Sequence, residues 1–198
     1  MLSSTLHDPF ESRAYRRIVW GLAALVLAIG AGEVIAALRT DSRFLLRDGL
    51  EWGWDVAIYG LAAVSFGRGA RVERAAGFVL AALLVGVGLE TGWQVAYTIA
   101  DPPAVEAEAV TISAALIVAQ SWFVVWLLVR FRGSRNPVIE ATWLSSRNDA
   151  ITGSLYAIVT LAARLVPSIW PQVAVDTLAM VLALKAGWDV ARDAWGSD

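Results

Sequence analysis

Carboxylate side chains recur at helical spacing in the segment RDGLEWGWDVAIYG. Asp48, Glu51 and Asp55 are three and four residues apart, so on a helix all three project from one face. Arg47 precedes Glu51 by one turn and can offset its charge near the helix end. No Lys or Arg follows deeper on that face. A divalent cation is the simplest partner for such acids, and Glu51 and Asp55 could ligate one ion from a single helix.

A second polar set lies in the segment TWLSSRNDAITGS. Asp149 is its strongest oxygen ligand, Ser145 precedes Asp149 by one turn, and Asn148 adds an amide oxygen. If the two segments pack side by side, Glu51, Asp55 and Asp149 supply three carboxylates around one ion. Ser145 or water would complete that metal site.

Structural roles compete with the metal site for the same residues. Asp48 lies near the end of its helix and could instead cap the helix or line a pore mouth. Arg147 could neutralise Asp149 in an ion pair, although its position points it elsewhere on the helix. The acids could also form an interhelical network with one or more of them protonated. Three other acids within apolar segments are more typical of helix packing or a water path: Glu33, Glu90 and Asp176.

Long apolar runs surround these acids. Hydrophobic residues make up 58% of the 198 residues, mean hydropathy is +0.59 and only 17% of residues are charged, whereas soluble domains average roughly 45–50% apolar. Residues 18–38 and 75–100 contain one charge each, and residues 110–129 contain none. Runs of about 20 such residues match the thickness of a bilayer core, and lipid requires helices for such spans. The composition therefore predicts an integral membrane protein.

The apolar runs predict an all-α, six-transmembrane-helix bundle. We expect a polar N-terminal tail over residues 1–15 and a membrane domain over residues 16–198. Tryptophans near span ends, Trp20, Trp93, Trp170 and Trp195, suit the headgroup layer, and paired glycines, Gly30, Gly32, Gly86 and Gly88, suit close helix contacts. The expected helices cover residues 16–38, 44–66, 73–100, 110–131, 138–165 and 171–195.

The distribution of arginine predicts that both termini are cytoplasmic. Three loops or tails that would share one side carry nine arginines, whereas the opposite side carries four, Arg39, Arg43, Arg47 and Arg164. The side richer in arginine is the one that faces the cytoplasm. The first apolar run has the length of a full span, so we expect no cleavable signal peptide, and we place the protein in a bacterial inner membrane. The net charge of −2 says little about partners. Nucleic acid requires an extended basic surface, the sequence gives no sign of one, and we therefore expect no nucleic-acid partner. The nine arginines expected on the cytoplasmic side are Arg13, Arg16, Arg17, Arg68, Arg71, Arg74, Arg130, Arg132 and Arg135.

The order of these motifs resembles the transmembrane domain of the cation diffusion facilitators. The segment DGLEWGWD (48–55) is similar to the family's D-A-x-H-S-x-x-D, with Glu51 in the His position. The segment ATWLSSRND (141–149) resembles the family's A-x-x-x-H-S-x-x-D, with Ser145 in the His position. RVE (71–73), Glu90 with DPP (101–103), and DTLA (176–179) resemble its later motifs. The sequence ends at Asp198, so we expect the family's C-terminal cytoplasmic domain to be missing.

The resemblance implies metal export driven by proton entry, through an alternating-access homodimer. Asp55 and Asp149 would be central ligands, Glu51 a ligand and proton carrier, Ser145 a weak or water-mediated ligand, and Asp48 a peripheral one. An all-oxygen site suits manganese or ferrous iron, and zinc also binds carboxylates; we expect no organic cofactor.

Two other functions remain open. One is a degenerate relative that regulates or scaffolds a partner without transporting. The other is a channel or a membrane enzyme, although the predicted spans contain no histidine or cysteine for covalent catalysis, and we expect no enzyme activity.

Overall fold

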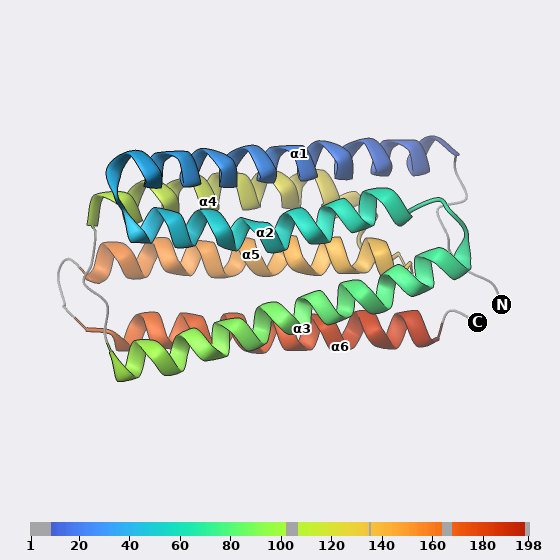
Figure 1. Ribbon diagram of the computed structural model, residues 1–198. Helices are drawn as coiled ribbons and strands as arrows, with labels where there is room; N and C mark the ends of the chain where they lie inside the picture. Colours follow the sequence, from blue (N-terminus) through green and yellow to red (C-terminus); the bar gives the residue numbers. More distant parts are fainter. Residues whose placement is uncertain (1–8, 102–106, 135, 164–167, 197–198) are drawn as a thin grey trace.

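The computed structural model describes residues 9–101, 107–134, 136–163 and 168–196, and within them it contains six α-helices and no strand. The helices run up and down in one bundle, and α1 begins at the same end at which α6 finishes (Figure 1). This end is called the terminal end below, and the other the opposite end. The helices are α1 (Pro9–Thr40), α2 (Arg43–Ser65), α3 (Ala70–Ala100), α4 (Ala107–Leu128), α5 (Pro137–Ala163) and α6 (Trp170–Trp195), with a short 3₁₀ turn, η1 (Val129–Phe131), after α4.

The all-α prediction is confirmed, and each observed helix lies within a few residues of its predicted range except at one boundary. Helix α1 begins at Pro9, so it extends into the segment predicted as a tail. His7, the single histidine, lies outside the described residues. Among those residues, Ser12–Thr40 and Ala70–Ala100 are long and apolar enough to qualify as membrane spans. The count of six spans stays a prediction.

Short polar turns set the ends of α2 and α3. Ser42 caps α2, because its hydroxyl accepts a hydrogen bond from the backbone N–H of Leu45 at 3.2 Å. Gly67 and Gly69 adopt φ of 79° and 101°, which glycine tolerates best, and they turn the chain into α3. Glu73 accepts hydrogen bonds from the Gly67 N–H and from Nδ2 of Asn136. The carboxylate thus joins the α2–α3 turn to the residue that precedes α5.

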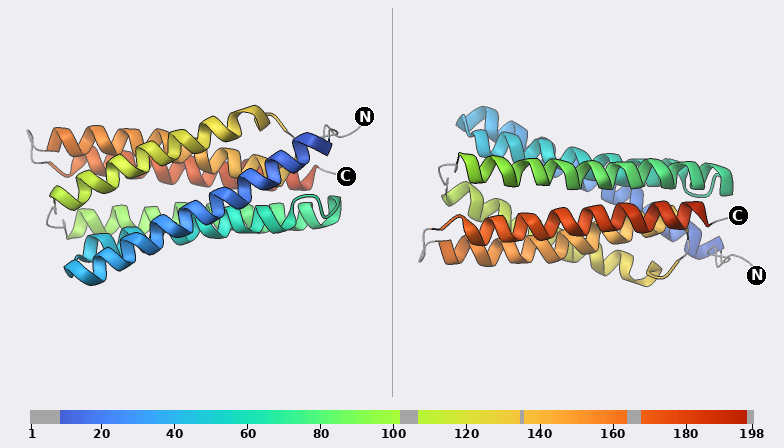
Figure 2. Two further views of the ribbon diagram at one scale, coloured as in Figure 1. Left: turned by 90° about the horizontal axis from the view of Figure 1, so that it is seen from above. Right: turned by 90° about the horizontal axis from the view of Figure 1, so that it is seen from below.

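Helix α5 lies in the middle of the bundle, in contact with α2, α3, α4 and α6. The most extensive helix contacts are α3 with α6 and α1 with α2. Two further views show α3 and α6 running side by side, whereas α1 and α2 lie together at the opposite end and diverge toward the terminal end (Figure 2). Contacts of α2 with α3 and α5 are much smaller. The bundle therefore contains two tightly packed helix pairs, and α2 meets α5 across a looser boundary.

Glycine allows the closest of these contacts. A Cβ atom on Gly30 would lie 2.8 Å from Cβ of Trp52, and one on Gly88 would lie 2.8 Å from Cγ of Leu184. A Cβ atom on Gly86 would lie 3.1 Å from the Trp54 ring, whereas Gly32 has nothing within 4 Å. The predicted role in helix contacts is thus confirmed for three of the four glycines and is wrong for Gly32.

The surface of the bundle is apolar and rich in tryptophan, with Leu27, Leu38, Trp122, Trp126 and Trp188 exposed. The four tryptophans expected near span ends, Trp20, Trp93, Trp170 and Trp195, are each at least half exposed. Such an exterior suits contact with lipid better than contact with water.

Candidate metal site between helices α2 and α5

Asp55 on α2 and Asp149 on α5 lie close enough to interact electrostatically. The Ser145 hydroxyl, one turn before Asp149, donates a hydrogen bond to the Asp149 carboxylate. Both acids are partly buried and Ser145 is buried. The structure therefore brings together three of the residues that the sequence predicts for a cation site.

Tyr59 lies between the Asp55–Asp149 pair and the terminal end. It is buried, lies one turn after Asp55, and interacts electrostatically with both carboxylates. The Tyr59 hydroxyl lies 3.0 Å from the Ser146 hydroxyl. Because Ser146 uses its own proton to bind the Thr142 carbonyl oxygen at 2.6 Å, the Tyr59 hydroxyl is the donor to Ser146.

A second closed layer lies nearer the terminal end, around Tyr15 of α1. Its hydroxyl lies 2.8 Å from that of Thr142. Its ring packs edge-on against Phe66 and Phe131, with centroid distances of 4.5 and 5.2 Å. All four side chains are buried. Two layers of buried side chains thus separate the Asp55–Asp149 pair from the terminal end.

Glu51 does not join the pair. Nε of Arg47 donates to Oε1 of Glu51 at 2.9 Å, and Nε2 of Gln94 on α3 donates to the same oxygen at 3.0 Å. The predicted offset of Glu51 by Arg47 is confirmed. Among the described residues, no three His, Cys, Asp or Glu side chains form a group that could hold a metal. The expected ring of three carboxylates is not assembled in this conformation, because Arg47 and Gln94 hold Glu51 one turn away, and the ring stays a prediction.

Glu51 lines a cavity of about 300 Å³ together with Arg47, Leu46, Leu50 and Glu90. These residues lie in the first half of α2 and the second half of α3, so the cavity is at the opposite end of the bundle. Three further acids interact electrostatically with this region: Asp48 and Glu90 with Glu51, and Asp176 of α6 with both Arg47 and Glu51. Asp48 is partly buried on the same stretch of α2.

Tryptophans of α2 bind acids of the two neighbouring helices. Nε1 of Trp52 donates to Glu33 of α1 at 2.9 Å, and Nε1 of Trp54 donates to Glu90 of α3. These bonds fix the rotation of α2 between α1 and α3. They support the packing role that the sequence suggested for Glu33 and Glu90.

Asn148 lies on α5 but faces α6. Its Nδ2 donates to the Leu182 carbonyl oxygen at 3.1 Å, and its Oδ1 accepts a bond from Arg147 at 3.1 Å. The expectation that Asn148 contributes an oxygen beside Asp149 is wrong, because α6 engages its amide. Arg147 correspondingly directs a guanidinium nitrogen toward Asn148 rather than Asp149.

The interpretation of the sequence missed Tyr59, Ser146 and Gln94. A signal existed for two of them, since Tyr59 continues the four-residue spacing of Glu51 and Asp55, and Gln94 lies one turn after Glu90. Ser146 had no comparable signal, because its role depends on which face of α5 meets α2.

Comparison with known proteins identifies the family of the chain. A family model described as the cation efflux transmembrane domain matches residues 18–196, and no curated protein matched the chain. The match spans nearly all the described helices and includes both acidic motifs. Members of that family are transporters rather than enzymes. The chain therefore belongs to the cation efflux transmembrane domain family, as a membrane protein whose general role is cation transport.

Proposed function

We propose that this protein transports a divalent metal cation, with Asp55 and Asp149 as its central ligands. The proposal is supported by the electrostatic interaction between the two carboxylates across the α2–α5 boundary. Two carboxylates side by side in a partly dehydrated place repel each other, and a doubly charged cation between them removes that repulsion. Acids at membrane depth are costly unless they serve such a purpose.

Glu51, Ser145 and Asp48 have supporting roles in this proposal. Glu51 becomes a further ligand when its side chain leaves Arg47, since it lies one turn from Asp55 on α2. Ser145 offers a hydroxyl oxygen directly or through water. Asp48 attracts cations near the cavity at the opposite end. These all-oxygen ligands favour manganese or ferrous iron at least as much as zinc.

Proton antiport follows from the chemistry of the ligands. A carboxylate must be ionised to hold the metal and can accept a proton once the metal leaves. One pair of acids can therefore couple metal efflux to proton entry if the bundle exposes it alternately to each side. The family resemblance adds a homodimer as the working assembly.

Metal flux in proteoliposomes tests this proposal. Asp55→Ala and Asp149→Ala should each abolish flux of manganese, iron and zinc while the protein stays folded. Asp101→Ala is the matched control, because it removes an exposed carboxylate at the end of α3 and should retain flux. Normal flux in both site variants would overturn the proposal. Collapse of the proton gradient should abolish uphill flux, and gradient-independent currents would indicate a channel instead.

A regulatory relative without transport is the second candidate. It is favoured by the lack of a three-acid group among the described residues and by a serine at position 145. Metal-dependent thermal stabilisation of the purified protein that disappears in Asp149→Ala would argue against it. Stabilisation equal in both proteins would favour it.

A further inference from the structure

One face of α1 near the terminal end carries a concentrated positive charge. Arg13, Arg16, Arg17 and Trp20 are separated by three, one and three residues, so they share a helical face, and all four are exposed. The opposite face of the same turns is buried through Tyr15 and other apolar residues. The arginines therefore point away from the core, toward the surroundings of the bundle.

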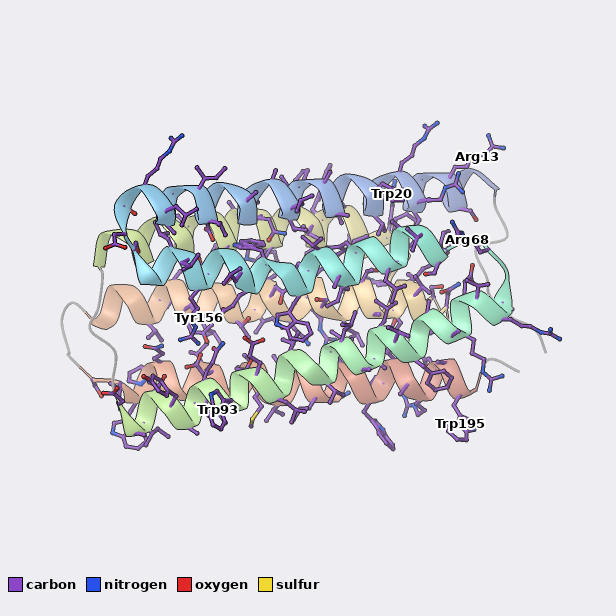
Figure 3. All side chains as sticks on the ribbon, viewed as in Figure 1. Arg13, Trp20, Arg68, Trp93, Tyr156 and Trp195 are labelled. Carbon is purple, nitrogen blue, oxygen red and sulfur yellow. The ribbon has the colours of Figure 1, made fainter. Side chains whose placement is uncertain are left out.

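The end of α2 and the turn that follows it add an apolar wall and a fourth arginine to this face. A cavity of about 450 Å³ is lined by Arg16, Arg17 and Trp20 of α1, by Ala63, Val64 and Phe66 at the end of α2, and by Arg68 in the turn that follows. The labelled side chains of Arg13, Trp20 and Arg68 lie together at this end of the bundle (Figure 3). This cavity, called the arginine pocket below, combines three guanidinium groups with an apolar wall.

No acid offsets the charge of the pocket within the part of the chain that the structure describes. Ion pairs there include Arg47–Glu51 and Lys185–Asp189, and Arg16, Arg17 and Arg68 take part in none among the described residues. Three neighbouring guanidinium groups repel one another. An anion in the pocket would remove this repulsion, and guanidinium groups bind phosphate through paired, charge-assisted hydrogen bonds.

The position of the pocket indicates which anion it takes. In a membrane protein, an exposed tryptophan such as Trp20 lies at the headgroup level, one turn from the arginines. The apolar wall of the pocket includes Val64, which is 39% exposed, and the buried Phe66. A phospholipid matches both parts, with its phosphate on the arginines and the start of its acyl chains on the wall, and basic pockets between helices are known to bind anionic lipid headgroups.

We propose that the arginine pocket is a binding site for the headgroup of an anionic phospholipid. Free inorganic phosphate would satisfy the arginines but leave the apolar wall unused. The site is independent of the proposed metal ligands, because Asp55 and Asp149 lie behind the buried layers of Tyr59 and Tyr15. The proposal stands whether or not transport is demonstrated.

Native mass spectrometry of the detergent-purified protein tests the pocket. Phosphatidylglycerol and phosphatidylcholine with identical acyl chains are titrated separately, and a single phosphatidylglycerol should be retained preferentially. Each arginine near an anionic lipid surface is worth about a fivefold change in affinity, so Arg16→Gln/Arg17→Gln should weaken the first phosphatidylglycerol about 25-fold. Arg71→Gln/Arg132→Gln is the matched control, because it removes two exposed arginines at the same end outside the pocket and should keep binding within about twofold.

A charge-neutral variant separates the pocket from general attraction to basic residues. Val64→Trp fills the apolar wall and should weaken phosphatidylglycerol without altering net charge, while circular dichroism should remain that of the unmodified protein. Excess inorganic phosphate should not displace the lipid. Equal retention of both lipids, equal losses in the two double variants, unaltered binding in Val64→Trp, or displacement by inorganic phosphate would each overturn the proposal.

Discussion

The Nε atom of Arg47 lies 2.9 Å from Oε1 of Glu51, and this ion pair determines which way Glu51 points. Glu51 could turn along α2 toward Asp55, but Arg47 and the amide of Gln94 hold it at the rim of the cavity at the opposite end. In the proposed mechanism, Arg47 therefore stays paired with the Glu51 carboxylate until a metal ion displaces the guanidinium group.

Removal of the Arg47 charge should tighten metal binding. In Arg47→Gln, Glu51 no longer has to break an ion pair before it can bind metal. The apparent affinity for manganese should rise by up to about fivefold, since exposed ion pairs contribute ~0.2–1 kcal/mol. Isothermal titration calorimetry of the purified protein measures the change. Arg39→Gln, an exposed arginine at the end of α1, is the control and should leave the affinity unaltered. Weaker binding in Arg47→Gln would contradict the competition between Arg47 and metal.

Asp55→Asn should make the metal-free protein more stable. The amide has the shape of the carboxylate but no charge, so the repulsion from Asp149 disappears, and we expect a gain on the order of 1 kcal/mol in the free energy of unfolding. Thermal unfolding in detergent measures the effect, with and without manganese. Added metal should stabilise the unmodified protein and not the variant. Asp41→Asn, in an exposed turn with φ of 55° that Asn tolerates, should alter neither measurement. A less stable metal-free Asp55→Asn protein would show that Asp149 does not repel Asp55.

Trp54→Phe should destabilise the bundle through Glu90. The partly buried carboxylate loses its indole donor, and a buried acceptor without a partner costs about 1–3 kcal/mol. Glu90→Gln retains an acceptor oxygen for Trp54 and should cost less. Trp93→Phe is the control, because Trp93 is 75% exposed. Thermal unfolding compares the three variants, and equal midpoints for Trp54→Phe and Trp93→Phe would argue against a structural role for the Trp54–Glu90 bond.

Gly49→Ala should separate α1 from α2. A Cβ atom at this position would lie 2.9 Å from Cγ2 of Val34 and 3.0 Å from the Gly30 carbonyl oxygen, and the backbone of α1 must shift to admit it. We expect a loss of about 1–3 kcal/mol in the free energy of unfolding. Gly53→Ala on the same helix has nothing within 4 Å of its added Cβ, so it should be neutral or gain about 0.5–1 kcal/mol. Unfolding in dodecyl sulfate should therefore show a lower midpoint for Gly49→Ala and an unaltered or slightly higher midpoint for Gly53→Ala. An equal shift of the midpoint in both variants would show that the packing of α1 on α2 does not depend on this contact.

The sequence was sufficient to place the helices because charged residues and turn formers interrupt the apolar runs. The pairing of Asp55 with Asp149 could also be predicted, once α2 and α5 were assumed to be neighbours. The direction of Glu51 could not, because Arg47 and Asp55 are both four residues from it and local spacing favours both partners equally. Gln94, which lies 43 residues after Glu51 in the chain, also binds the Glu51 carboxylate and so adds to the hold of Arg47 on Glu51.

Asn148 shows the same limit on a different helix. Its neighbours in sequence include Asp149, so the pattern indicates a shared site, but successive residues on a helix point about 100° apart. Only the packing of α6 against α5 determines that the Asn148 amide binds the Leu182 carbonyl oxygen. Sequence spacing identifies residues on one face, whereas the partner of that face depends on the tertiary arrangement.

The unequal packing of the helices has a mechanical consequence for the carboxylate pair. Glycines at the closest approaches let α1 pack tightly against α2, and α3 against α6, whereas α2 contacts α5 over a short stretch. Asp55 and Asp149 occupy that short stretch. In the transport proposed above, a rocking displacement of one helix pair would open the α2–α5 boundary between the acids without unpacking either pair, so a lightly packed boundary would coincide with the proposed ion site.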